Sequence, residues 1–142
     1  MSGRQEPRGL LDTSTVILLP RLTDPADLPT EPLISAVTLA ELSVGPLVAK
    51  SDEERAARQS HLQQAESDFE PLAFDANAAR AFGQVAASLR RTGRKPAARA
   101  YDAMIAATAI ANGLPLFTCN PKDFAFIDNL EVIAVPHPDH DS

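Results

Sequence analysis

Short apolar runs alternate along the chain with longer segments in which apolar residues recur at helical spacing. The runs contain few polar interruptions, and such continuous apolar strands are typical of a parallel sheet that helices cover on both faces. The pattern therefore predicts an α/β fold, a three-layer sandwich with a central, mostly parallel sheet of four or five strands flanked by helices. The predicted strands occupy residues 9–12, 32–35, 69–74, 115–118 and 131–135.

Caps and helix breakers set the boundaries of the helices. A Ser, Thr or Asp before an apolar segment supplies a cap, while Gly and Pro end a helix. Ser51 followed by Glu54 is a capping-box pattern. Helices are predicted from Thr13 or Ser14 to Leu19, from Ser35 or Thr38 past Leu42 with a break or kink at Gly45 and Pro46, from Ser51 to about Ala65, from Asp75 to Gly93 and from about Ala100 to Asn112, with a helical turn over Pro121–Phe126.

Length and composition indicate a single domain over residues 1–142. We expect a core at about 9–135, a short polar N-terminal extension and a loose tail over Pro136–Ser142. No apolar run is long enough to cross a bilayer, and the first eight residues lack the apolar stretch of a signal peptide, so a cytoplasmic location is expected. Cys119 is the only cysteine, which excludes an internal disulfide and a cysteine-based zinc or iron-sulfur site.

Three acidic residues each stand alone as the only charged residue of a segment rich in apolar residues. Burying an unpaired carboxylate costs on the order of several kcal/mol, so each acid requires compensation. No basic residue of the same segments is expected to provide it. The three are Asp12 in segment 9–20, Glu41 in segment 32–49 and Asp102 in segment 100–121.

The predicted topology places these acids at one edge of the sheet. Asp12 ends the first strand, and Glu41 lies about two turns into the helix that leaves the second. Asp102 is in the first turn of a helix that precedes a parallel strand, so this helix end also lies at the carboxyl edge. Carboxylates held together take up protons unless a cation joins them. Oxygen ligands alone favour Mg²⁺ or Mn²⁺, which suits the hydrolysis of a phosphodiester.

Each acid also has a purely structural interpretation. Asp12 can cap the following helix, Asp102 can be a first-turn acid stabilised by the helix dipole, and Glu41 can pair with a distant arginine. Considered one at a time, these interpretations are favoured. The placement of all three at one edge favours a site.

Basic residues gather in one span of a chain whose net charge is -6. The net charge argues against binding of nucleic acid by the charge of the whole molecule, but not against a local basic surface. The span is either a solvated helix end, where cations are favourable, or a rim that steers phosphates toward Asp102. It contains Arg90, Arg91, Arg94, Lys95 and Arg99.

Four segments carry a further pattern in their order and spacing. They are Leu11–Ser14, Ala40–Leu42 with Gly45, Asp102–Ala109 and Leu116–Phe124. These segments resemble the motifs of PIN-domain ribonucleases, most of all the VapC-type toxins of VapBC toxin-antitoxin systems, and the likeness extends from about Gly9 to Val135. The resemblance implies a Mg²⁺-dependent endoribonuclease that cuts structured RNA such as transfer or ribosomal RNA. It also implies inhibition by a VapB-type antitoxin, a homodimer, and a heterotetramer or larger assembly with the antitoxin.

The resemblance also assigns roles to residues. It makes Asp12, Glu41 and Asp102 the catalytic and metal-binding triad, with Thr13 or Ser14 and Thr118 as supporting hydroxyls. Many relatives have Asp where this chain has Asn120, so Asn120 is expected as a neutral ligand or water-holder and Asp123 as an outer contributor. Antitoxins of this kind insert a basic or aromatic segment into the acidic pocket and pack a helix into an apolar groove. The helices after Glu41 and Ser51 are candidates for the walls of this apolar groove.

Two other functions stay open as alternatives. A receiver-like phosphorelay domain would use Asp12 for metal, Asp75 as phosphoacceptor and Thr118 beside it, but Glu41 and Asp102 would then have no role. A non-catalytic protein-interaction module predicts that Asp12→Asn leaves every phenotype intact. No Gly-rich phosphate loop is present.

Thiol catalysis or a metal site at Cys119 is disfavoured by the positions of the histidines. His61 lies in a polar helix, while His137 and His140 lie in the tail. All three are expected at the surface.

Overall fold

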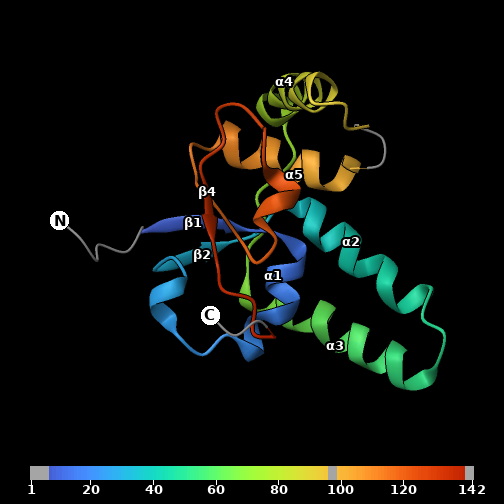
Figure 1. Cartoon of the computed structure of the whole chain (residues 1–142). Coiled ribbons are helices and arrows are strands. Elements are labelled where there is room, and N and C mark those ends of the chain that lie inside the picture. The colour runs from blue at the N-terminus through green and yellow to red at the C-terminus, as the bar shows by residue number, and fades with distance from the viewer. Residues whose placement is uncertain (1–6, 96–98, 140–142) are drawn as a thin grey trace.

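The computed structural model describes residues 7–95 and 99–139. At its centre is a sheet of four parallel strands in the order β2-β1-β3-β4 (Figure 1). The predicted parallel sheet is confirmed. The strands are β1 Arg8–Leu11, β2 Glu31–Leu33, β3 Leu116–Thr118 and β4 Val132–Ala134.

Helices cover both faces of the sheet, with α4 and α5 on one side and α1 and α3 on the other (Figure 1). Neighbouring strand residues accordingly enter different cores. Leu10 and Leu116 pack on the α4–α5 side, whereas Leu11 and Phe117 pack on the α1–α3 side. The α-helices are α1 Thr13–Leu18, α2 Ala36–Leu47, α3 Asp52–Asp68, α4 Ala76–Arg91 and α5 Ala100–Ala111; the 3-10 helices are η1 Leu19–Arg21, η2 Pro25–Asp27 and η4 Pro121–Phe124.

Segment 69–74 is not a strand, which corrects the sequence prediction. Only Leu72 pairs with the sheet region, through an isolated parallel bridge to Ser35. Leu72 donates its backbone N–H to the carbonyl of Ile34 at 2.9 Å and accepts that of Ala36 at 2.8 Å, and the pairing ends there because α2 begins at Ala36. Phe69 donates its backbone N–H to the carbonyl of Ala65 at 3.0 Å, so α3 continues to Asp68, beyond its predicted end at about Ala65. The connection between α3 and segment 69–74 is therefore shorter than predicted.

The helix caps follow the predictions at α2, α3 and α4 but differ at α1. The side chains of Ser35, Ser51 and Asp75 each accept a backbone N–H in the first turn of the helix that follows. At α1 the cap is Asp12, and Thr13 lies inside the helix. Asp12 has an extended backbone and an acceptor side chain, so its structural interpretation as the cap of this helix is confirmed, whereas the assignment of the cap to Thr13 or Ser14 is wrong.

The last turns of α2, α4 and α5 contain the predicted breakers. Pro46 lies one residue before the end of α2, so it marks the end of this helix. Gly93, with φ 79°, follows α4, and Gly113, with φ 64°, follows α5. These left-handed conformations suit glycine.

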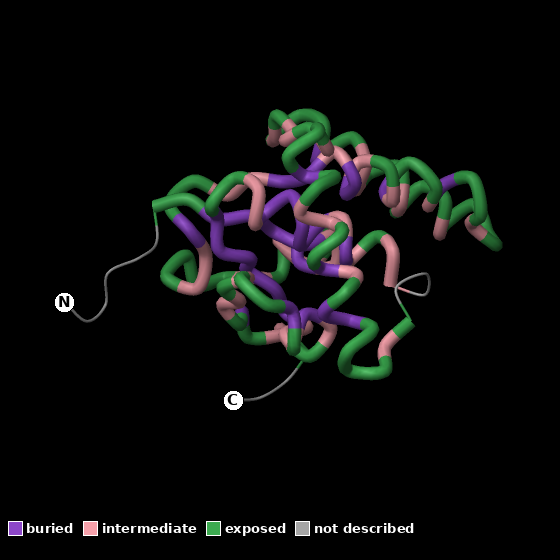
Figure 2. Tube along the Cα trace, turned by 90° about the horizontal axis from the view of Figure 1, so that it is seen from above, coloured by how far each residue is buried: buried purple, intermediate pink, exposed green. Residues whose placement is uncertain are grey.

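Buried residues are concentrated in the two inner strands, β1 and β3, and in α5, whereas most of α3 is exposed (Figure 2). The central helix α5 is rich in alanine, which allows its neighbours to pack close to its backbone. Within residues 7–95 and 99–139, no helix combines the length and the apolar character that crossing a bilayer requires. Part of the predicted loose tail contacts the rest of the chain, because Asp139 forms an ion pair with Arg21. His140 lies outside the described residues.

Gly9 tests the packing across the sheet. A Cβ at this position would lie 2.4 Å from Cε1 of Phe117, a side chain that is buried in the α1–α3 core. We expect Gly9→Ala to lower the free energy of unfolding by about 1–3 kcal/mol, measured by urea denaturation, because the ring must shift against its neighbours.

Gly83→Ala is the matched control for this substitution. Gly83 lies inside α4, and a Cβ there meets nothing within 4 Å. We expect this change to raise the free energy of unfolding by about 0.5–1 kcal/mol, because alanine favours the helix over glycine. If Gly9→Ala raised the free energy of unfolding as much as Gly83→Ala, that result would contradict the close contact between Phe117 and β1.

Candidate active site

Asp12 is a buried carboxylate at the carboxyl end of β1, with 4% of the residue exposed. Its Oδ1 accepts the backbone N–H of Thr15 at 3.3 Å and also the hydroxyl of Thr15. Its Oδ2 accepts the hydroxyls of Ser14 at 3.1 Å and Thr118 at 2.9 Å. The carboxylate is therefore held by donors that carry no charge.

Thr15 is a supporting residue that the sequence analysis missed. It is fully buried, and its hydroxyl oxygen accepts the backbone N–H of Cys119 at 3.0 Å while it donates to Asp12. The hydroxyl thus ties the start of α1 to the end of β3. The available signal was the cap itself, because an N-cap side chain reaches the residue three positions on.

Glu41 approaches the site from α2 and is half-buried. The hydroxyl of Thr13 donates to Glu41 Oε1 at 2.6 Å, and the hydroxyl oxygens of Thr13 and Thr38 lie 3.0 Å apart. Since a hydroxyl has one hydrogen, Thr38 is the donor to Thr13. This relay joins α1 to α2 and fixes the side chain of Glu41.

Asp102 and Asp123 share one positive partner, Arg99. Its Nη1 lies 3.1 Å from Asp123 Oδ1 and 3.9 Å from Asp102 Oδ2. The compensating charge of Asp102 therefore comes from outside its own segment, which the sequence prediction did not consider. Arg99 stands just outside the apolar segment, but the spacing of three residues places it beside Asp102.

The pKa of Asp102 is raised to about 6, mainly by burial. The negative charges of Asp123, Glu41 and Asp12 contribute to this rise, and Arg99 opposes it. These mutual effects place the four predicted acids in one electrostatic cluster.

The other two members of the predicted triad are also perturbed. Burial raises the pKa of Asp12, although the hydrogen bonds from Thr15, Thr118 and Ser14 act in the opposite direction. Burial and the charge of Asp12 raise the pKa of Glu41, while the hydrogen bond from Thr13 lowers it. Burial therefore outweighs hydrogen bonding at both carboxylates.

Asn120 belongs to the layer of polar groups that holds Asp12. Its Nδ2 donates to the hydroxyl oxygen of Ser14 at 3.0 Å, and its backbone N–H donates to the hydroxyl oxygen of Thr118 at 2.9 Å. Both hydroxyls are thereby directed at Asp12. The structure gives Asn120 a role in orienting these donors.

The donor set suits a hard divalent cation because it consists of carboxylate and hydroxyl oxygens. Among the described residues, no group of three or more His, Cys, Asp or Glu side chains is arranged to hold a metal ion. Mg²⁺ commonly takes only one or two carboxylates and completes its octahedron with water and substrate phosphate. The raised pKa of Asp102 shows that repulsion is present for a cation to relieve. The residues therefore fit Mg²⁺ or Mn²⁺.

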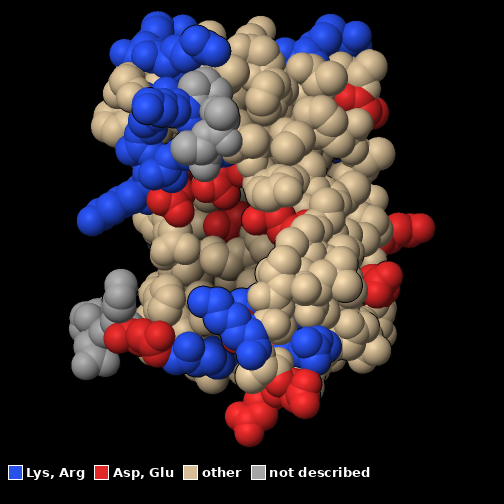
Figure 3. Space-filling view, turned by 90° about the vertical axis from the view of Figure 1, so that its right-hand side faces the viewer, with Lys and Arg blue, Asp and Glu red and all other residues tan. Residues whose placement is uncertain are grey.

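Acidic side chains gather in a hollow near the middle of one face, with Lys and Arg along one side of it (Figure 3). The residues of the basic span have different contacts. Arg91 forms an ion pair with Asp128, and the guanidinium of Arg94 lies 5.5 Å from the ring centre of Phe126. Two more basic residues of the span lie outside the acidic cluster and are exposed, namely Arg90 and Lys95.

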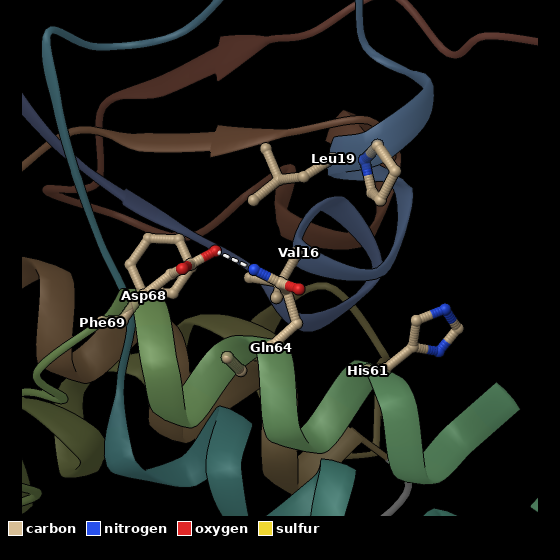
Figure 4. A pocket seen from close by; sticks show the side chains of 8 residues that line it. Val16, Leu19, His61, Gln64, Asp68 and Phe69 are labelled. Carbon is tan, nitrogen blue, oxygen red and sulfur yellow. Dashed lines mark hydrogen bonds between the residues drawn. The ribbon is translucent and has the colours of Figure 1, made fainter. Parts of the chain in front are cut away.

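Two adjoining hollows lie between α1 and α3, and α2 lines only the smaller of them. The one beside Glu41 measures about 260 Å³, and the second measures about 400 Å³. They share His61, which is half-buried between them and is not the open surface residue that the sequence predicted. Figure 4 shows the second hollow, where Gln64 donates to Asp68 at 2.6 Å along α3. Its lining residues are Val16, Leu19, Pro20, His61, Gln64, Ala65, Asp68 and Phe69.

Cys119 has the environment of a core residue. The side chain packs with Leu11 and Phe117, and burial raises the pKa of its thiol. A thiol with a raised pKa stays protonated and is a poor nucleophile. The interpretation of Cys119 as structural agrees with these contacts.

The fold and the site together define a class of protein, an α/β domain with an acidic, oxygen-lined site at the carboxyl edge of a parallel sheet. Residues 10–130 match the family described as "PIN domain". The chain belongs to the PIN-domain family.

Several characterised proteins are similar to this chain over most of their length. "Ribonuclease VapC5" of Mycobacterium tuberculosis is 38% identical over 132 residues, which cover 89% of this chain and 95% of the relative. "Ribonuclease VapC" of Rickettsia bellii is 30% identical and covers 92% of this chain and 98% of its own. The crystal structure of VapBC-5, a toxin-antitoxin system from Mycobacterium tuberculosis, has a chain with TM-score 0.78 and 36% identity, covering 91% of this chain and 99% of that chain. The predicted PIN-like fold is confirmed.

The raised pKa of Asp102 predicts how stability depends on pH. Its value of about 6 in the folded protein lies above the ordinary value of 3.8, so the folded state binds the proton more tightly than the unfolded state. This contribution to stability is fully present below pH 3.8 and is lost as the pH rises through about 6. We expect the free energy of unfolding, measured by urea denaturation in chelator, to fall less over this range in Asp102→Asn than in the unaltered protein.

Asp24→Asn is the control for this pH series. Asp24 is exposed and caps η2, a role that asparagine also fills. Its pH profile is expected to match that of the unaltered protein. An unchanged pH profile in Asp102→Asn would contradict the described environment of Asp102.

Proposed function

We propose that this chain is a metal-dependent endoribonuclease that hydrolyses phosphodiester bonds of RNA, and that it is the toxin of a type II toxin-antitoxin pair. The observation that carries the proposal is the electrostatic coupling of three acids from separate segments, because the charges of Glu41 and Asp12 both raise the pKa of Asp102. Membership of the PIN-domain family and the likeness to relatives named Ribonuclease VapC support it. Transfer or ribosomal RNA is the proposed substrate class.

We infer that Asp12 and Asp102 are the central metal ligands, with Glu41 beside them and Asp123 as an outer contributor. When bound, Mg²⁺ or Mn²⁺ neutralises the charge of a phosphodiester and lowers the pKa of a water molecule. The chain's own part is to hold the carboxylates in position, with hydrogen bonds that partly oppose the rise in pKa caused by burial at Asp12 and Glu41.

The hydroxyl layer carries out this positioning. Thr15 and Thr118 fix both oxygens of Asp12, and Thr13 fixes Glu41 through one hydrogen bond. Residues that orient the ligands of a metal often change metal affinity or activity by about 10- to 100-fold when they are removed. Thr15 therefore joins Thr13, Ser14 and Thr118 as a supporting residue of the proposed site.

The basic side of the hollow is the proposed approach for RNA. Arg94 extends toward η4, where its Nη1 lies 3.4 Å from the carbonyl oxygen of Lys122. Phe126, beside Arg94, is 65% exposed and has φ 71°, an uncommon conformation for an aromatic residue. An exposed ring next to a cation suits stacking on an unpaired base. The basic residues proposed to contact the RNA backbone are Arg90, Arg91, Arg94 and Lys95.

The two hollows between α1, α2 and α3 form the proposed groove for a VapB-type antitoxin. Apolar side chains extend this surface along the end of α2, where Val44, Leu47 and Val48 are 46%, 85% and 60% exposed. Exposed apolar residues in a contiguous patch favour a protein partner. Some of the similar solved structures are VapBC complexes, among them a VapBC2 complex from Rickettsia felis bound to a DNA fragment from its promoter, with 26% identity, TM-score 0.68 and coverage of 88% of this chain and 96% of that chain.

The remaining parts of the proposal concern assembly and location. A homodimer, and a heterotetramer or larger assembly with the antitoxin, are proposed from the likeness to VapC-type toxins. A cytoplasmic location is proposed with them. The carboxylate of Asp75 caps α4 through the backbone N–H of Ala78, which accounts for this residue without a phosphorelay.

Asp12→Asn separates a nuclease from a non-catalytic interaction module. The amide keeps the shape of the side chain but lacks the charge, so the protein is expected to fold while cleavage of RNA falls by more than about 100-fold. We would measure new RNA ends after incubation with purified protein and Mg²⁺. Asp102→Asn is expected to behave in the same way.

Asp52→Asn is the control for cleavage, because Asp52 is exposed at the start of α3. It is expected to cleave as the unaltered protein does. Cleavage that persists in a highly purified double variant of Asp12 and Asp102 would refute the nuclease assignment.

Gln64→Trp tests the proposed antitoxin groove. Gln64 is an exposed residue that lines the larger hollow, so a tryptophan there would fill the space without disturbing the core. We expect its Kd for the cognate antitoxin, measured by calorimetry, to rise by about 10-fold or more, while RNA cleavage stays unchanged.

Gln63→Trp is the matched control on the same helix, since Gln63 is exposed but does not line the hollow. It is expected to bind the antitoxin normally. Equal affinities for both variants would place the antitoxin elsewhere.

A further inference from the structure

Arg99 lies where the basic span meets the acidic cluster. It immediately precedes α5, its side chain is 35% exposed, and one nitrogen faces both Asp102 and Asp123. The side chain is directed at carboxylates of the site, unlike Arg91 and Arg94, which contact Asp128 and Phe126. Arg99 therefore differs from the rest of the basic span.

The other carboxylates of the cluster are stabilised in a different way. Asp12 and Glu41 accept hydrogen bonds from hydroxyl groups, and Asp12 also from a backbone N–H. Among the ion pairs of the described residues, only those of Arg99 reach the acidic cluster. The negative charge of the cluster is thus offset on one side alone.

A fixed positive charge at this place has two opposite effects. It attracts the carboxylates of Asp102 and Asp123, and it repels any other cation that binds them. A planar guanidinium keeps its charge at all ordinary pH values and cannot be neutralised by deprotonation. A divalent ion that uses these carboxylates must therefore compete with Arg99 for them.

We propose that Arg99 is a built-in counter-cation of the site, which competes with the divalent metal for Asp102 and Asp123 and so weakens metal binding. This inference rests on the metal site of the proposed function. It makes Arg99 a positioning residue that sets metal affinity through two carboxylates. The proposal predicts that metal binding displaces Arg99 from Asp123 and frees its guanidinium for an RNA phosphate.

The test is the affinity of the purified, full chain for Mn²⁺, measured by calorimetry and by the electron paramagnetic resonance signal of free Mn²⁺. We expect Arg99→Gln to bind Mn²⁺ about 10-fold more tightly than the unaltered protein, because a like charge near the ion has been removed. Exposure of the side chain to solvent keeps this effect moderate. Raising the salt concentration should reduce the difference between the two proteins.

Two further variants separate charge from structure. Arg99→Lys keeps the charge and is expected to bind Mn²⁺ within about 3-fold of the unaltered protein, whereas a purely structural role of the guanidinium would make it resemble Arg99→Gln. Arg91→Gln removes the same charge from the same span but from a partner of Asp128, and it is expected to leave the affinity unchanged. Circular dichroism and thermal unfolding verify that each variant is folded.

Several results would overturn the proposal. Equal affinity in Arg99→Gln would show that the guanidinium does not compete with the ion, and weaker affinity would show that it helps to build the metal site. If Arg91→Gln bound Mn²⁺ more tightly by the same factor, the effect would come from the overall charge of the protein and not from the position of Arg99. If the unaltered protein bound no Mn²⁺, the proposed function would fail together with this inference; if it bound Mn²⁺ and cleaved RNA, only the inference would be at stake.

Discussion

The site depends on the burial of the Asp12 carboxylate without a positive charge beside it. Removing a carboxylate from water costs on the order of several kcal/mol, and each hydrogen bond to a charged group offsets about 1.5–3 kcal/mol. Hydroxyls from α1 and β3 and a backbone N–H of α1 supply these bonds. The pKa of Asp12 is nevertheless raised, so burial prevails over hydrogen bonding. The ionised carboxylate is therefore less stable here than in water, and a bound cation would stabilise it.

The parallel topology determines which residues share this environment. Strand β1 lies between β2 and β3, so the segments that leave or approach these strands meet at its carboxyl end. Glu41 arrives on α2, and Asp102 arrives at the start of α5. The buried alanines of α5, such as Ala103 and Ala106, allow this helix to lie at the centre of the protein. Its first turn, where exposed backbone N–H groups favour an acid, can then point into the hollow.

The sequence singles out the acids because a lone charge in an apolar segment is visible without coordinates, and their role as a metal site stays a prediction. It predicted the partners of these acids less well. Thr15 was missed because the cap was assigned one residue too late, which hid the contact between a capping carboxylate and the third residue of its helix. Arg99 was missed as a partner of Asp102 because it lies just outside the apolar segment. Segment 69–74 has the composition of a strand, and its failure to form one depends on the longer α3 and on the start of α2, which ends the partner segment after Ser35. These errors concern individual hydrogen bonds, which periodicity does not record.

The same fold gives the acids of the cluster different electrostatic surroundings, and this difference gives the site a direction. Asp12 is enclosed by neutral donors at the base of the hollow, while Asp102 and Asp123 face a cation at its rim. A second positive charge is therefore most stabilising beside Asp12 and least stabilising beside Arg99. A phosphate group, which is negative, has the opposite preference and is attracted to the basic side.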